Sequence, residues 1–213
     1  MKTDELILLL SNVQQPIDAR LLNRLIWVAA VLSLIAVAIL VLVTLGPRVD
    51  LSVGIALGFV QAKALLGASV ALVALLAFER SLRPGQAAGP RLALVALPFA
   101  ALAIWAGAAL AQAPAAQWSE MALGRWWLSC LVALLVYALA PFVAMVGVAR
   151  QGAPVRPRLT GACAGLASAG LATIAYSLHC PEDSAPFIAS WYPLAMACMA
   201  ALGAMTFPRL VRW

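Results

Sequence analysis

Charged residues are scarce in this chain. Of 213 residues only 10% are Asp, Glu, Lys or Arg, whereas 65% are hydrophobic and the mean hydropathy is +1.00. A soluble globular domain carries about 25% charged residues, so the composition excludes an ordinary water-soluble domain. A single globular core has no room for this much apolar surface, and the chain is therefore predicted to be a polytopic membrane protein in contact with lipid.

Motifs for catalysis are also missing. No apolar run holds paired acids, and the chain has neither a P-loop nor a C-x-x-C pair. We therefore expect no enzymatic activity and no bound cofactor. The net charge of +6 does not indicate nucleic-acid binding, because the basic residues flank apolar runs and form no stripe with interleaved aromatics.

Six apolar stretches are long enough to cross a bilayer, which takes about 20 residues. They are continuous rather than alternating and rich in Ala and Leu, which predicts helices and not strands. The predicted spans are Leu25–Leu45, Val60–Phe78, Leu92–Leu110, Trp126–Ala149, Leu159–Ser177 and Pro186–Phe207. We predict an all-α fold, a bundle of six transmembrane helices in residues 25–213 that follows an N-terminal segment of residues 1–24.

The N-terminal segment does not have the pattern of a signal peptide. It includes Asp4, Glu5 and Asp18, and the apolar cluster Leu6–Leu10 is too short for the apolar region of a signal. We expect no cleavage.

Lysine and arginine predict the orientation in the membrane. If the N-terminus lies in the cytoplasm, the cytoplasmic segments carry eleven basic residues and the opposite loops carry only Arg48 and Arg125. The eleven are Lys2, Arg20, Arg24, Arg80, Arg83, Arg91, Arg150, Arg156, Arg158, Arg209 and Arg212. Because basic residues concentrate on the cytoplasmic side, both termini are predicted to be cytoplasmic.

The N-terminal segment contains one short amphipathic pattern. Leu6, Leu9, Leu10 and Val13 follow the spacing of one helix face, and Pro16 ends the pattern. A helix of about ten residues is not stable alone in water, so its apolar face must lie on the membrane surface, on the bundle or in a partner's groove. Its polar face has no Lys or Arg run, which counts against the membrane surface.

A polar stretch from Ser177 to Pro193 lies between the last two predicted spans and reads as a hairpin. It holds His179, the only histidine, together with Cys180 and Glu182. These side chains react with oxidants or bind soft metals when they are suitably placed. The alternative is a plain loop in which the proline and the acids only turn the chain.

Cys130 makes this hairpin more informative. Threading through the bilayer places Cys130 about one turn below the outer interface, at the level of Cys180. Two thiols that face an oxidising compartment form either a structural bridge or a redox- or metal-responsive pair. A zinc site would need about four ligands, which His179 and Glu182 would complete, although no C-x-x-C spacing supports one. We assign Cys163 and Cys198, which lie within spans five and six, to helix packing, as small buried residues.

Lys63 is the one charge inside a predicted span, close to the end that faces outside. Snorkelling of the side chain to the interface is the expected account, and pairing with Asp50 or Glu120 is the alternative. A transporter would place charged groups near mid-membrane. A membrane thiol-redox subunit would carry a C-x-x-C pair or a quinone site. These two classes are the alternatives for function, but neither pattern is visible.

Several stretches of the chain resemble the NrsF-type anti-sigma factors. They are M-K-T-D-E-L-I-L-L-L, the K-A-L-L that begins at Lys63, W-L-S-C and L-H-C-P-E-D-S-A-P-F-I-A-S-W-Y. The resemblance covers nearly the whole chain, and H-C-P-E is its most specific part. It implies a bacterial inner-membrane protein of six helices that holds an extracytoplasmic-function sigma factor inactive through its cytoplasmic N-terminus. It also implies that Cys130 and Cys180 respond to oxidants or heavy metals.

Overall fold

The computed structural model describes residues 19–50, 54–83 and 92–211. Within these ranges the chain is helical and has no strand, as predicted. The long helices are α2 (Ala19–Thr44), α3 (Gly54–Ser81), α5 (Ala96–Ala111), α7 (Trp127–Ala149), α8 (Pro157–Tyr176) and α9 (Ala185–Leu210). A 3-10 turn, η1 (Ala93–Val95), precedes α5, and η2 (Ala115–Gln117) and α6 (Trp118–Leu123) connect α5 to α7.

Six helical segments are long and apolar enough to cross a membrane, and each overlaps one predicted span. Two helices begin six residues earlier than predicted: α2 begins at Ala19 rather than at Leu25, and α3 begins at Gly54 rather than at Val60. Leu22 and Ile26 are both buried, which continues the apolar face of α2 by more than a turn toward the N-terminus. The short helix α6 was not predicted, because a six-residue helix carries too little periodicity.

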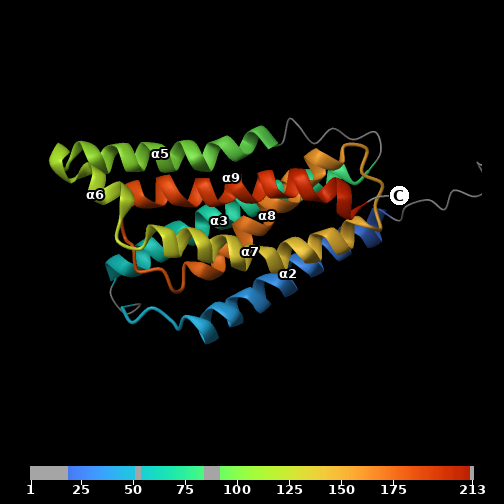
Figure 1. The fold of residues 1–213 in the computed structure, drawn as a ribbon, viewed down its shortest axis with the longest axis horizontal. Helices are drawn as coiled ribbons and strands as arrows, with labels where there is room; N and C mark the ends of the chain where they lie inside the picture. The colour runs from blue at the N-terminus through green and yellow to red at the C-terminus, as the bar shows by residue number, and fades with distance from the viewer. Residues whose placement is uncertain (1–18, 51–53, 84–91, 212–213) are drawn as a thin grey trace, which may run out of the picture.

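Helix α8 lies at the centre of the bundle and packs against α2, α3, α7 and α9 (Figure 1). Its close contacts are made by glycine. A Cβ atom at Gly165 would collide with the carbonyl oxygen of Met199 on α9, and one at Gly170 would lie 2.7 Å from the carbonyl oxygen of Gly67 on α3. Gly161 and Gly165, at the i, i+4 spacing in the sequence that lets helices pack closely, therefore lie on a contact surface where backbones touch directly.

Large aliphatic side chains cover the outside of the bundle. On α2 they include Val31, Leu32, Ile35, Ile39 and Val43, all exposed. Helix α5 packs mainly against α9 and leaves most of its own surface uncovered. A lateral surface of this kind is compatible with lipid contact, because in a bilayer the apolar face points outward as well as inward.

The two ends of the bundle differ in composition. At one end of the bundle lie the first residue of α2 and the last residue of α9 (Figure 1). The described residues that follow α3 and α7 lie at this end too. The opposite end holds the described residues 45–50 that follow α2, helix α6 and the loop of residues 177–184 between α8 and α9. We call it the Cys180 end. It holds every predicted site residue that the structure describes.

Candidate functional site

The two outer cysteines lie side by side. Cys130 is in the first turn of α7, and Cys180 is in the loop between α8 and α9. Their Sγ atoms are 3.4 Å apart, and the residues are 1% and 0% exposed. Both are free thiols. The fold therefore joins two residues fifty positions apart into one buried thiol pair.

Cys180 is placed by a tight turn that follows α8. The N–H of Cys180 donates to the carbonyl of Tyr176, the last residue of that helix, over 3.1 Å. The hydroxyl of the same Tyr176 donates to Sγ of Cys130 over 3.3 Å. One residue at the helix end thus contacts both cysteine-bearing segments.

Glu182 binds the start of α7 and not the thiols. Its Oε1 accepts the backbone N–H groups of Arg125 and Trp126 over 3.0 and 3.1 Å. These two residues directly precede α7, and a carboxylate near the N-terminus of a helix is stabilised by the helix dipole. Glu182 therefore ties the loop to the turn of α7 that carries Cys130.

His179 points toward the α2–α3 connection. Its Nδ1 lies 3.0 Å from the carbonyl oxygen of Gly46, to which it must donate, and its ring lies 5.8 Å from that of Tyr176. Among the described residues, no group of three or more His, Cys, Asp or Glu side chains is arranged to hold a metal ion. The structure thus unites Cys130 with Cys180 and gives His179 and Glu182 other partners.

The expected snorkelling of Lys63 is wrong. Lys63 is 0% exposed, and its Nζ donates to the carbonyl oxygen of Cys180 over 3.0 Å and to Oδ1 of Asp183 over 3.3 Å. A fully buried ammonium needs such partners, because an unpaired charge away from water is very costly. The alternative of ion pairing holds, but the partner is Asp183 rather than Asp50 or Glu120.

Arg48 is the second buried cation of the site, and sequence reasoning missed it. Its guanidinium donates to the Cys180 carbonyl over 3.0 Å, to both carboxylate oxygens of Asp183 over 2.8 and 2.5 Å, and to Asp50. Hydrogen bonds to Asp50 and Asp183 raise the pKa of Arg48, and Arg48 in turn lowers the pKa of Asp50. The sequence did contain an indication of this role. Arg48 is one of only two basic residues in the loops predicted to lie outside, and an arginine in such a loop suggests a specific partner.

The thiols are chemically unequal. The hydrogen bond with Cys130 lowers the pKa of the Cys180 thiol, burial raises it, and the nearby charge of Lys63 lowers it further. The thiolate is the reactive form of cysteine toward oxidants and soft metals. The arrangement is therefore suited to a reaction in which Cys180 is the nucleophile and Cys130 is the partner thiol.

The other two cysteines differ from each other. Cys163 is fully buried in α8, in agreement with a packing role. Cys198 is exposed on α9, so the packing role expected for it is wrong. The helical phase of α9 explains this difference, since Met196 and Met199 occupy its buried face.

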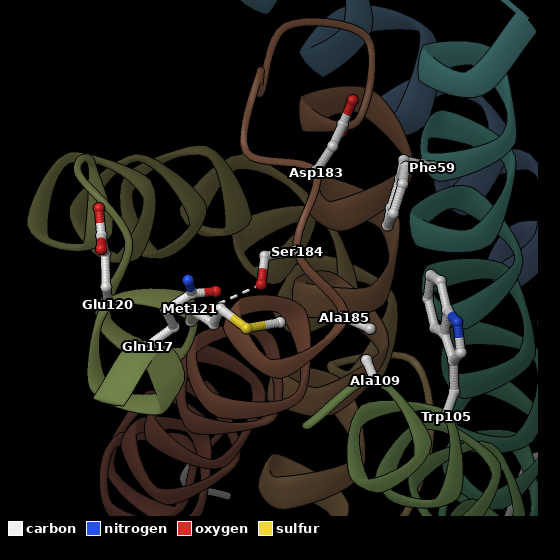
Figure 2. A pocket seen from close by; sticks show the side chains of 9 residues that line it. All are labelled: Phe59, Trp105, Ala109, Gln117, Glu120, Met121, Asp183, Ser184 and Ala185. Atoms are coloured by element: carbon white, nitrogen blue, oxygen red, sulfur yellow. Dashed lines mark hydrogen bonds between the residues drawn. The ribbon is translucent and has the colours of Figure 1, made fainter. Parts of the chain in front are cut away.

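An open cavity of about 530 Å³ adjoins the charged loop. Figure 2 shows Phe59 and Trp105 on one side, α6 residues on the other, and Asp183 and Ser184 between them. The rings of Phe59 and Trp105 stack with centroids 5.4 Å apart, and Ser184 Oγ donates to the carbonyl of Met121 over 2.8 Å. The wall of this cavity therefore reaches the carboxylate that holds Arg48 and Lys63.

The predicted sigma-factor-binding residues Leu6, Leu9, Leu10 and Val13 lie outside the described residues.

Fold and site together define a helical bundle, with six segments long and apolar enough to cross a membrane and a buried thiol pair at one end. The chain belongs to the NrsF family, described as "Negative regulator of sigma F", whose profile matches residues 10–213. It is similar to the "Probable anti-sigma-F factor NrsF" of Azospira oryzae, with 33% identity over 220 residues, and to the "Anti-sigma-F factor NrsF" of Caulobacter vibrioides, with 33% identity over 218 residues. Both alignments cover 100% of each chain. No solved structure matches the chain. The relatives are thus negative regulators of a sigma factor, and the family is regulatory.

Proposed function

We propose that this chain is a membrane-bound anti-sigma factor that sequesters an extracytoplasmic-function sigma factor and releases it when Cys130 and Cys180 react with an oxidant or a heavy metal. Family membership supports the regulatory role. The observation that carries the sensing role is the pair of free thiols 3.4 Å apart at one end of the bundle. Such a pair is chemically able to form a disulfide or to bind a soft metal.

In the proposed topology the protein spans the bacterial inner membrane six times with both termini in the cytoplasm. The positive-inside rule supports this orientation, because Arg20, Arg80, Arg150 and Arg209 all lie at the end opposite Cys180. The Cys180 end then faces the periplasm, where disulfides persist. Reporter fusions at Arg156 and Asp183 test this orientation, and periplasmic activity at Arg156 would overturn it.

Two steps describe the reaction with a hydroperoxide. The Cys180 thiolate attacks the peroxide oxygen, which forms a sulfenic acid on Cys180 and releases hydroxide from hydrogen peroxide. The Cys130 thiol then attacks the Cys180 sulfur, the S–S bond forms, and the sulfenic oxygen leaves as water after protonation. One peroxide is reduced to two waters while two thiols are oxidised to one disulfide.

Disulfide formation shifts sigma-factor binding only if its free energy differs between the sigma-bound and the released conformation, and the shift equals that difference. A difference of about 3 kcal/mol changes the bound fraction by roughly two decades. In the chain-entropy model a disulfide that closes a loop of about 50 residues contributes roughly 4 kcal/mol relative to the unfolded chain, so a difference of about 3 kcal/mol is of the same order.

The charged groups of the site argue against a transporter. Lys63, Arg48 and Asp183 gather at one end of the bundle, whereas transport sites lie near the middle of the membrane. No described observation favours a transporter or a thiol-redox subunit over the regulatory function.

Single-cysteine variants test the sensing role. The full-length protein and a sigma-F factor are combined in lipid nanodiscs, and the retained sigma factor is measured before and after hydrogen peroxide or cadmium. Cys130→Ser and Cys180→Ser are expected to accumulate normally and to lose the response, because one thiol alone closes no bridge. Cys163→Ser and Cys198→Ser are the matched controls and should respond like the parent. If both outer variants still release the sigma factor, the pair is not the sensor.

Leu9→Asp tests the proposed binding segment. Burial of one leucine contributes about 1.5–3 kcal/mol, so this change should weaken sigma-factor binding by about one to two decades without loss of the membrane protein. Ser11→Asp lies on the opposite face of the predicted helix and is the control. A stably inserted Leu9→Asp protein that still retains the sigma factor would contradict the assignment.

A further inference from the structure

The main-chain carbonyl of Cys180 is held by two buried cations. Arg48 Nη1 and Lys63 Nζ each donate to it over 3.0 Å, and both also bind the carboxylate of Asp183. Arg48 is 6% exposed and Lys63 is 0% exposed. Charge-assisted hydrogen bonds of this kind are short and directional, so the backbone position of Cys180 and those of the two cations are coupled.

The two cations belong to segments that differ in how tightly they are packed. Lys63 belongs to α3, whose backbone contacts α8 directly at Gly67 and Gly170. Close backbone contact leaves that helix little freedom to shift without a collision. Lys63 is therefore an anchor for Cys180, and a movement of Cys180 meets resistance on this side.

Arg48, by contrast, lies in the connection that follows α2. Its backbone N–H donates to the carbonyl of Leu178 over 3.0 Å, and His179 Nδ1 binds the carbonyl of Gly46 over 3.0 Å. On the other side, the hydroxyl of Thr44, the last residue of α2, lies 2.6 Å from the hydroxyl of Tyr137 on α7. The end of α2 is thus tied to the Cys180 loop on one side and to the helix of Cys130 on the other.

Helix α2 connects this end of the bundle to the opposite end (Figure 1). It is one continuous helix of 26 residues, about 39 Å long at 1.5 Å per residue, with no proline inside. It begins at Ala19, directly after the segment that holds the predicted sigma-factor-binding residues. It lies at the edge of the bundle with a largely exposed surface, and helices so placed shift by 1–2 Å in known switching transitions.

We propose that Arg48 is the positioning residue that transmits the redox state of Cys180 to α2, with Asp183 as its shared counter-ion. This inference rests on the proposed function. When the disulfide forms, the sulfur atoms must approach by about 1.3 Å, from 3.4 Å to the bond length of about 2.05 Å. The Cys180 carbonyl moves with its sulfur. Because Arg48 is fastened to this carbonyl and to Asp183, the end of α2 follows it.

Arg48→Lys separates transmission from thiol chemistry. Lysine keeps the positive charge, but one ammonium cannot reproduce the planar fork that joins the carbonyl and two carboxylates. Arg125→Lys is the matched control, because Arg125 is an exposed arginine at the same end whose guanidinium lies 6.0 Å from the Trp126 ring. Two quantities are measured on full-length protein in nanodiscs after graded hydrogen peroxide: the fraction of Cys130–Cys180 disulfide by thiol labelling and mass spectrometry, and the fraction of sigma-F factor released.

In Arg48→Lys, disulfide formation should match the parent, while the release equilibrium constant at equal disulfide falls about tenfold, which corresponds to about 1.4 kcal/mol of coupling. A merely structural role of Arg48 would lower both quantities together. Arg125→Lys should match the parent in both. Equal release by Arg48→Lys and the parent at equal disulfide would overturn the proposal.

Asp50→Asn provides the second variant. The Asp50 side chain is 42% exposed and binds Arg48, so loss of its charge loosens the fork while the fold retains Asp183 and Lys63. Release at equal disulfide should fall by less than in Arg48→Lys. If Arg48→Lys does not accumulate, unchanged release in Asp50→Asn overturns the proposal. A parent protein that forms the disulfide without release would instead overturn the proposed function itself.

Discussion

Helix α8 is held in two different ways along its length. In its middle, glycines place its backbone directly against α3 and α9. At its Cys180 end it runs into a loop that two cations, two carboxylates and a carbonyl hold in place. The first kind of contact depends on shape alone, whereas the second depends on charge and protonation. Only the second kind is able to respond to a chemical signal.

The same contrast separates the cysteines. Cys163 lies in the shape-dependent part of α8, is fully buried and has neither a thiol nor a cation as a described partner. Cys180 lies in the charge-dependent part, with a thiol 3.4 Å away and two cations on its own carbonyl. Burial alone makes a cysteine inert, and the neighbours decide whether a buried cysteine reacts.

Gly165→Leu tests the shape-dependent contact and should have the largest effect. The new side chain would overlap the backbone of α9 at Met199, and a backbone carbonyl cannot move aside as a flexible side chain does. We expect little or no folded protein in the membrane fraction. Gly147→Leu is the control, because nothing lies within 4 Å of a Cβ at that position in α7. Normal abundance of Gly165→Leu would contradict close packing of α8 on α9.

Asp183→Asn tests the charge-dependent contact. It leaves Arg48 and Lys63 without their shared charge, and loss of one partner of a buried ion pair costs about 3–5 kcal/mol. Because the Asp183 side chain is 22% exposed, we expect about 2–3 kcal/mol, less than for a fully buried pair. The measurement is the denaturation midpoint in detergent, with the exposed Glu120→Gln as control. Equal midpoints for both variants would show that the network contributes nothing to stability.

The pH dependence of disulfide formation is the smallest expected effect. Since the pKa of Cys180 is lowered, its thiolate persists below the value of about 8.5 typical of a free cysteine. The rate of reaction with hydrogen peroxide should therefore fall only as the pH drops through this lower pKa. The same shift contributes stability that is fully present above the pKa of the unfolded thiol and is lost as the pH falls through the folded pKa.

Lys63→Met and Lys63→Arg sharpen this measurement. Removal of the positive charge should move the midpoint of the rate profile to higher pH, because a nearby cation favours the thiolate. Lys63→Arg keeps the charge and should restore the midpoint. Identical profiles for the parent and Lys63→Met would remove Lys63 from the control of Cys180 reactivity.

The sequence by itself determined the six helices and the small-residue face of α8. Both follow from patterns within one segment, either a continuous apolar run of spanning length or glycines at a helical spacing. It also predicted that Cys130 and Cys180 lie at the same membrane level, because helix length and alternation of direction set the depth of every residue.

Only the tertiary structure decided the partners within that level. Lys63, Arg48 and Asp183 come from α3 and two different loops, and no pattern in one segment says which of several acids a buried cation will meet. The same is true of Glu182, which suits a metal ligand in the sequence and in the fold accepts the two backbone N–H groups just before α7. Depth is a property of each helix alone, whereas pairing depends on which helices are neighbours and on how each is rotated. The packing of the other helices around α8 sets which helices are neighbours and how each is rotated, through contacts between residues far apart in the chain.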